Sequence, residues 1–381
     1  MGEQTQRFTL DGNADLEARL EDICAEVLEH VSTIVPAANL EGLVLGGGYG
    51  RGEGGVLKTP SGEMPYNDLE FYVFIAGNRL LQERKYGNRL LHLAESLSET
   101  HHLHIEFKIE SLQRLRTSPL SMFSYDLVSR HRILHGKATL FTGCERHLCS
   151  EAIPNAEASR LLLNRFTGLL LVKEILAGGW VKPEEADFSR RNLAKAQLAL
   201  GDAMLAHAGR YHWSCLERRR RLETLEESFP RILEIRTHHA SGAEFKFHPY
   251  QSCETWGELA TAHKAIGSLA LDLWLSLESR RLSRGFSTAR EYAFSPLRKW
   301  PATPAWRNWL LTLRTFGAKA LFASGSLQYP RERLFNALPL LLWDVGCEPR
   351  ALGRLQQQLH TGAADWFGLV GAYKRVWSSY G

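Results

Sequence analysis

The fold is decided by Leu45-Gly46-Gly47-Gly48-Tyr49-Gly50-Arg51-Gly52-Glu53, followed by Asn67-Asp68-Leu69-Glu70-Phe71-Tyr72-Val73. The first segment comes directly after the apolar run 43–45, which predicts a strand, and its glycines let backbone amides approach a phosphate closely. In the second segment Asp68 and Glu70 are two residues apart on a predicted strand, so both carboxylates leave the same face. Such a pair repels itself unless a cation neutralises it, and Mg²⁺ prefers carboxylates together with phosphate oxygens. Loop and pair together indicate nucleotide-phosphate chemistry.

The first 150 residues alternate between helical and extended patterns, which indicates an α/β module. Helices are expected at 14–35, 78–99 and 119–131, and strands at 43–45, 66–75, 101–109 and 132–136. Asn78 is the expected N-cap of the second helix. The segment 58–65 contains two prolines and a glycine, so we expect a turn-rich excursion outside the core.

The predicted strand 101–109 carries a third carboxylate, Glu106. Its alternation sends apolar and polar side chains to opposite faces. The apolar face has Leu103, Ile105, Phe107 and Ile109, and the polar face has His102, His104, Glu106 and Lys108. A polar strand face of this kind either meets solvent or lines a site, and for the histidines solvent is the favoured interpretation.

Beyond residue 150 strand patterns nearly vanish, so residues 1–150 and 151–381 are expected to be separate domains, the second all-helical. Helices are expected at 161–176, 183–208, 212–228, 255–282, 306–322, 331–343, 349–359 and 363–377, with an irregular connection at 286–304. Arg218–Arg221 predicts an ion-paired, solvated helix, with an RNA-backbone contact as the alternative. Asp202 is expected on the helix surface, or else in contact with an acceptor.

The order of strand, glycine loop, Asp-x-Glu strand, helix and Glu strand resembles the nucleotidyltransferase superfamily with the polymerase-β-like fold. Gly47-Gly48 matches its Gly-Ser or Gly-Gly element, and 49–53 is similar to the Ala-Arg-Gly-Glu continuation of small members. Asn67–Phe71 matches the carboxylate pair, and Ile105-Glu106-Phe107 matches the third carboxylate. The fold class implied is α+β/α: a nucleotidyltransferase α/β module with a mixed sheet, followed by an all-helical domain.

This resemblance implies a site and a reaction. Asp68, Glu70 and Glu106 would be the catalytic and Mg²⁺-binding residues, and the nucleotide would be bound by Gly47, Gly48, Arg51 and, from the second domain, Lys195. The reaction would be Mg²⁺-dependent transfer of a nucleoside monophosphate, with ATP as the favoured donor, to a hydroxyl of a small-molecule or protein acceptor. The alternatives are a toxin-like enzyme that acts on tRNA and a catalytically weak nucleotide-binding protein.

The chain departs from the usual family pattern at three places. The usual serine is Gly48, which removes a hydroxyl contact to phosphate, and the spacer between Gly48 and Asp68 is longer than in compact members. The second carboxylate is Glu70 rather than aspartate, which places its oxygens one methylene further from the backbone.

Composition bounds the remaining possibilities. The chain has 381 residues with 44% hydrophobic and 23% charged residues, which is typical of a globular protein of two domains. A net charge of +4 is too small to indicate nucleic-acid binding by itself, and it weakly favours a small-molecule or protein acceptor over RNA. Six scattered cysteines without a CxxC pair, no signal-peptide pattern and no long apolar run predict a cytoplasmic protein without a membrane contact.

Overall fold

The structure, a computed structural model, describes residues 6–66, 68–226, 229–301, 303–322, 327–344 and 348–380. The chain forms two compact units that are interleaved along the sequence, whereas the predicted domains are continuous. Unit 1 runs up to Pro154 and includes Ala208–Thr224 and Ala243–Tyr250; unit 2 consists of Asn155–His207, Leu225–Gly242 and the residues from Gln251 onward.

Unit 1 is built on a four-stranded mixed sheet in the order β5-β4-β1-β6. The strands are β1 (Leu40–Leu45), β4 (Leu69–Ile75), β5 (Ile105–Glu110) and β6 (Arg132–His135). The central strand β1 is antiparallel to both of its neighbours, and β4 is parallel to β5. The expected mixed sheet at the N-terminal end of the chain, with helices after it, is therefore present.

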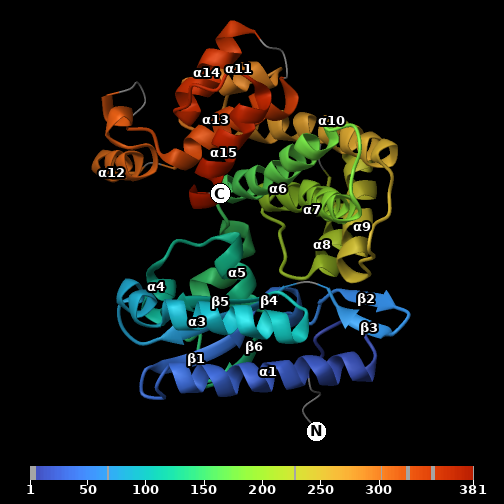
Figure 1. Cartoon of the computed structure of the whole chain (residues 1–381), viewed down its shortest axis with the longest axis vertical. Coiled ribbons are helices and arrows are strands. Elements are labelled where there is room, and N and C mark those ends of the chain that lie inside the picture. The colour runs from blue at the N-terminus through green and yellow to red at the C-terminus, as the bar shows by residue number, and fades with distance from the viewer. Residues whose placement is uncertain are drawn as a thin grey trace. The chain divides into compact units, whose positions relative to one another are not determined.

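Successive side chains of β1 and β4 point to opposite sides of the sheet. Both sides carry apolar residues, and helices cover both faces. Helices α1 (Ala14–Ile34) and α3 (Arg79–His101) cover one face (Figure 1). The core on that side contains Leu43, Leu45, Phe71, Val73, Ile75 and Ile105. The core on the other side contains Val44, Tyr72 and Phe74 with residues of α4 (Leu112–Thr117) and α5 (Met122–Ser129).

Local sequence signals explain most boundaries in unit 1. The Asn78 side chain accepts hydrogen bonds from the backbone amides of Leu80 and Leu81, as a helix cap should, which confirms the predicted start of α3. The strand predicted from 101 begins only at Ile105, because α3 continues to His101 and His102 ends it in the left-handed region with a φ of 52°.

The segment 58–65 lies mostly outside the core, as expected, but it contains two strands that were not expected. Val56–Thr59 (β2) and Gly62–Pro65 (β3) form an antiparallel hairpin. The turn between the strands uses Gly62 at a φ of 123°, and the turn residues that dominate the sequence here conceal two very short strands.

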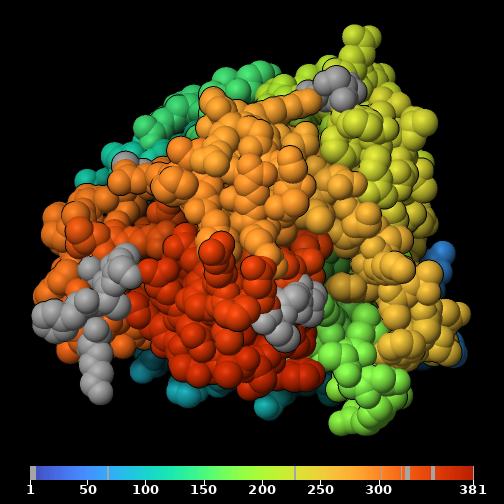
Figure 2. Space-filling view, turned by 90° about the horizontal axis from the view of Figure 1, so that it is seen from above, coloured from blue at the N-terminus to red at the C-terminus, as the bar shows by residue number. Residues whose placement is uncertain are grey.

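Unit 2 is helical, as expected. Its helices are α6 (Asn155–Leu176), α7 (Pro183–His207), α10 (Trp256–Arg281), α11 (Ala289–Phe294), α12 (Ala305–Phe316), α13 (Pro330–Trp343), α14 (Pro349–Leu359) and α15 (Trp366–Tyr380), with a 3-10 turn, η3, at Ala318–Phe322. The residues coloured orange to red form one continuous packed surface in Figure 2.

Helix α4 and two helices further along the chain lie where the sequence predicts no helix. Helix α9 (Ile232–Phe247) was missed because its apolar residues do not gather on one face. Helix α11 lies inside the predicted irregular connection and is only six residues long, with Thr288 as its cap. Helix α8 (Cys215–Glu223), in unit 1, begins later than predicted because Ser214 caps it, and it ends at Glu223; positions 227 and 228 of the predicted range lie outside the described residues.

The described part of the chain contains no helix that is both long enough and apolar enough to span a bilayer. Its cysteines Cys24, Cys144, Cys149, Cys215 and Cys253 are free thiols.

Candidate functional site

The glycine loop packs directly against the carboxylate strand. A four-residue helix, α2 (Gly47–Gly50), follows β1, and the Gly46 amide donates a 2.9 Å hydrogen bond to the Glu70 carbonyl. Gly47 has a φ of 62°, and a Cβ at this position would lie 3.5 Å from Glu70 Cδ. A Cβ on Gly50 would lie 2.1 Å from the Leu45 carbonyl oxygen, so only glycine fits the tight turn there.

The parallel pairing of β4 with β5 brings two of the expected carboxylates side by side. Glu70 and Glu106 are register partners, and Tyr72 is the partner of Lys108 one step further along the same face. The Lys108 ammonium lies 3.4 Å from Glu70 Oε2 and 3.1 Å from Glu106 Oε2. The Tyr72 hydroxyl donates a 2.7 Å hydrogen bond to Glu70 Oε2. The two carboxylates thus converge on one positive charge.

Electrostatic contacts favour the ionised forms of Glu70 and Lys108. Burial opposes ionisation of Glu70, but the Lys108 ammonium and the Tyr72 hydroxyl outweigh it and hold the pKa of that carboxyl below its ordinary value. Burial likewise opposes the charge on Lys108, and Glu70 and Glu106 overcome it, so the pKa of the ammonium is raised. Both shifts favour the charged forms, the Lys108 ammonium and the Glu70 carboxylate.

The Mg²⁺ that the family resemblance implies can be compared with this donor set. Glu70 and Glu106 offer oxygen ligands of the kind Mg²⁺ prefers and already share a cation, so the pair suits one such ion. Asp68 is exposed and precedes β4. Within the described ranges, no group of three or more His, Cys, Asp or Glu side chains is arranged to hold a metal. The structure therefore brings together two of the three predicted ligands, with Lys108 between them.

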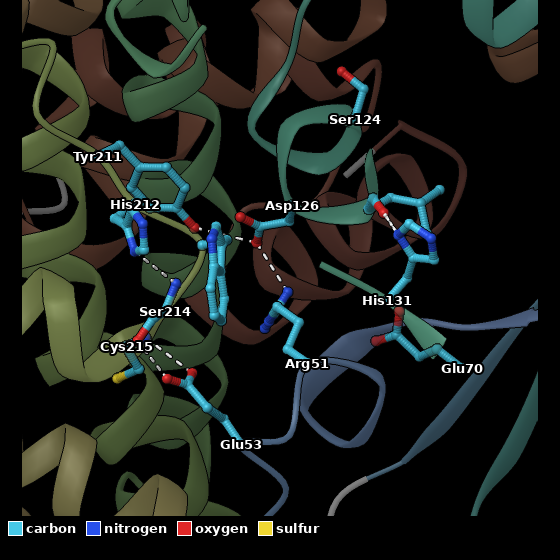
Figure 3. A network of polar contacts seen from close by, with 12 residues as sticks. Arg51, Glu53, Glu70, Ser124, Asp126, His131, Tyr211, His212, Ser214 and Cys215 are labelled. Atoms are coloured by element: carbon cyan, nitrogen blue, oxygen red, sulfur yellow. Dashed lines mark hydrogen bonds and ion pairs between the residues drawn. The ribbon is translucent and has the colours of Figure 1, made fainter. Parts of the chain in front are cut away.

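Arg51, a predicted nucleotide contact, is paired inside the protein. Its guanidinium lies 3.0 Å from Asp126 Oδ2 on α5, and the Tyr211 hydroxyl donates to the same oxygen at 3.3 Å (Figure 3). Only 14% of the Arg51 side chain is exposed. Its positive charge still acts on Glu70, where it helps to lower the carboxyl pKa. Arg51 thus contributes positive electrostatic potential at Glu70. Its contact with phosphate stays a prediction.

Glu53, at the end of the glycine loop, has a structural role. Its buried carboxylate accepts hydrogen bonds from Ser214 Oγ at 2.6 Å and from the Cys215 amide at 2.9 Å, at the start of α8 (Figure 3). The Lys246 ammonium donates to the Glu53 carbonyl at 2.8 Å. Anions are favoured at helix N-termini, so Glu53 fastens the segment that carries α8 to the glycine loop within unit 1.

Two predictions concern residues of helix α7. Lys195 is exposed on α7 in unit 2, and its nucleotide-binding role stays a prediction. The surface position expected for Asp202 is wrong: the residue is buried, and its carboxylate hydrogen-bonds to His239 Nε2 at 3.0 Å. Helix α7 buries side chains around much of its circumference. A polar residue on this helix is therefore not necessarily exposed to solvent.

The arginine run 218–221 is ion-paired as expected at three of its four positions. Arg220 and Arg221 contact Glu217, and Arg219 contacts Glu223. Arg218 departs from the expectation of a solvated residue, because it is buried and donates to the carbonyls of His212 and Trp213.

The partners of the predicted site residues Glu70, Glu106 and Arg51 were not predicted from the sequence. Tyr72 is two residues from Glu70 on β4, and Lys108 is two residues from Glu106 on β5. Alternation therefore places each of them on the same face of its strand as the nearby glutamate. Asp126 carried no such signal, because its contact with Arg51 spans 75 residues of chain. No family model matches the chain, and the comparisons with curated proteins and with solved structures found no significant match.

Proposed function

We propose that this protein is a metal-dependent nucleotidyltransferase that transfers AMP from ATP to a hydroxyl of a small-molecule or protein acceptor and releases pyrophosphate. The observation that carries the proposal is the pairing of Glu70 with Glu106 in adjacent parallel strands, beside a glycine loop that packs on Glu70. Oxygen ligands for a divalent cation and backbone amides for phosphate then lie at one end of the same strands.

In the proposed reaction, the acceptor oxygen forms a bond with the α-phosphorus while the bond from that phosphorus to the bridging β-oxygen breaks. The pyrophosphate takes the electron pair, and the acceptor proton passes to Glu106, which is the more exposed of the two paired carboxylates. Asp68, Glu70 and Glu106 would hold the metal. When bound, Mg²⁺ would supply neutralisation of phosphate charge and activation of the acceptor hydroxyl.

The test is transfer of an α-labelled nucleotide. The full chain is incubated with Mg²⁺, α-³²P-ATP and a cell extract, and labelled small molecules and proteins are separated and identified. Glu70→Gln and Glu106→Gln should each lower labelling by about 100-fold or more, because each removes an anionic ligand. Glu99→Gln, on the exposed surface of α3, is the matched control and should label as the wild type does.

Binding measurements separate the nucleotide assignment from the chemistry. Calorimetry of ATP with Mg²⁺ should give binding to the wild type and none to Asp68→Ala/Glu70→Ala. Absence of binding for ATP and for the other nucleoside triphosphates would reject the nucleotide assignment.

A nucleotide-binding protein without transferase activity is the second candidate, favoured by two features of the site. Lys108 already neutralises the carboxylate pair, and Gly48 replaces the hydroxyl residue of the family pattern. This candidate predicts carboxylate-dependent ATP binding with no labelled product from any acceptor pool. The ion pairing of Arg219, Arg220 and Arg221 gives the tRNA alternative no added support.

A further inference from the structure

Lys108 supplies a positive charge at the point where the proposed function requires a metal. Its ammonium is within 3.4 Å of both paired carboxylates and lies 5.5 Å from the centre of the Tyr72 ring. Tyr72 in turn donates to Glu70, so ring and hydroxyl hold the two charged groups together. The chain therefore carries its own cation for the Glu70–Glu106 pair.

The position of this lysine follows from the pleat of β5. Side chains two residues apart leave the same face, so Lys108 is necessarily beside Glu106, and the parallel register sets it diagonally across from Glu70. The side chain is 36% exposed, and its four-carbon stem is flexible. The ammonium is thus held by electrostatic contacts and can leave when a better anionic partner arrives.

We propose that Lys108 is a competing counter-ion of this site, which keeps free divalent cations weakly bound and gives way to a complex of metal with polyphosphate. The inference rests on the proposed function. A free divalent ion must share Glu70 and Glu106 with an ammonium that repels it. A nucleoside triphosphate brings several phosphate charges, which offer the displaced ammonium a new partner while the carboxylates take the metal. The protein therefore binds the metal–nucleotide complex as its substrate. A free divalent ion does not occupy the carboxylates before the nucleotide arrives.

The test is Mn²⁺ binding to the full chain without nucleotide, followed through the electron paramagnetic resonance signal of free Mn²⁺. Lys108→Met keeps the length of the stem and removes the charge, and it should bind Mn²⁺ about tenfold or more tightly than the wild type. Lys108→Arg keeps the charge and should bind as weakly as the wild type. Lys58→Met, at an exposed position on β2, is the matched control and should change nothing.

A further variant tests where the gained ion sits. Adding Glu70→Gln to Lys108→Met should abolish the gain, because it removes one of the two carboxylates that the lysine had neutralised. A gain that survives Glu70→Gln would place the metal elsewhere and overturn the inference. Equal Mn²⁺ affinity of the wild type and Lys108→Met would also overturn it.

The labelling assay separates this inference from the proposed function. Transfer of label without a gain in Mn²⁺ affinity for Lys108→Met rejects the counter-ion role and leaves the transferase standing. A gain in Mn²⁺ affinity without any labelled product supports competition at the carboxylates and rejects the transferase. Absence of Mn²⁺ binding to every variant, with and without ATP, rejects both.

Discussion

Among the described residues, a lysine lies near two glutamates in each unit: Lys108 in unit 1 and Lys299 in unit 2. The pKa values of the two lysines are shifted in opposite directions. The sheet cluster, Lys108 with Glu70 and Glu106, is about one-third or more exposed at each side chain. In the helical cluster of unit 2, Lys299 is 1% exposed, Glu278 1% and Glu332 9%. The pKa of Lys108 is raised, whereas burial, aided by the charge of Arg354, lowers the pKa of Lys299 to about 7.

Contacts account for the difference. The Lys108 ammonium faces both of its carboxylates directly. The Lys299 ammonium donates instead to Asn336 Oδ1 and to the Ser295 carbonyl, and Glu332 accepts from the Lys299 backbone amide at 2.8 Å.

The carboxylate of Glu278 is occupied by other donors: Ser159, Arg281 and Tyr292. The same residue types thus form an ionised pair where water helps to solvate them. Where water is excluded, they form a polar network in which the lysine loses its charge near neutral pH.

The largest effect is expected on breaking the helical cluster. Glu278→Ala removes the acceptor of two buried hydroxyl donors, Ser159 and Tyr292, and leaves the partly buried Arg281 charge without its carboxylate. The free energy of unfolding of unit 2 should fall by about 3–5 kcal/mol. Urea titration followed by tryptophan fluorescence measures this, because Trp213 is the one tryptophan of unit 1 and the other nine lie in unit 2.

Glu184→Ala, at an exposed position on α7, is the control and should change the free energy of unfolding by less than about 0.5 kcal/mol. If Glu278→Ala costs no more than this control, the network does not hold unit 2 together.

A smaller effect is expected from the charge of Lys299. Its folded pKa of about 7 is below the ordinary lysine value of 10.5, so between these values the unfolded chain binds the additional proton. Raising the pH through this window therefore stabilises the fold. From pH 8 to pH 10 the wild type should gain about 1–2 kcal/mol relative to Lys299→Met, measured by urea unfolding at each pH. Parallel pH profiles for the two proteins would show that Lys299 keeps its charge in the fold.

The matched change in the sheet cluster should hardly affect stability. Lys108→Met removes a partly exposed ion pair, and such pairs contribute about 0–1 kcal/mol to the free energy of unfolding. Hydrogen exchange of β4 and β5 peptides reports this locally. A loss as large as that expected for Glu278→Ala would mean that Lys108 is a structural residue, and the comparison between exposed and buried clusters would fail.

The smallest effect is expected at His248, a second partly exposed cation between two carboxylates in unit 1. Hydrogen bonds to Asp11 and Glu244, each 2.8 Å long, outweigh partial burial and raise its pKa. Its contribution to stability is present below the ordinary value of 6.5 and is lost as the pH rises through the raised folded value.

NMR titration of the His248 ring should show a lower pKa in Asp11→Asn and in Glu244→Gln than in the wild type. A contribution of less than about 1 kcal/mol is expected because the side chain is partly exposed. No change in the His248 pKa in either variant would show that these hydrogen bonds do not form in solution.

Much of unit 1 was predictable because its signals are local. Alternation predicted that Glu70 leaves β4 on the face opposite its apolar residues and that Glu106 leaves β5 on its polar face, and the cap at Asn78 marked the start of α3. The hairpin at β2 and β3 and the helix α9 were not predictable, because the first is two short strands around a turn and the second lacks an amphipathic pattern.

In the candidate site, too, some features were predictable from the sequence and others were not. The sequence determined the residue types, the spacing of the carboxylates and the presence of the glycine loop before them. Only the tertiary structure decided that β5 lies parallel beside β4, so that Lys108 neutralises Glu70 and Glu106, and that Arg51 is paired with Asp126. The physical reason is range: propensity and periodicity act over a few neighbouring residues. The electrostatic partner of a charged group is selected by strand order and helix packing, which join residues far apart in the chain.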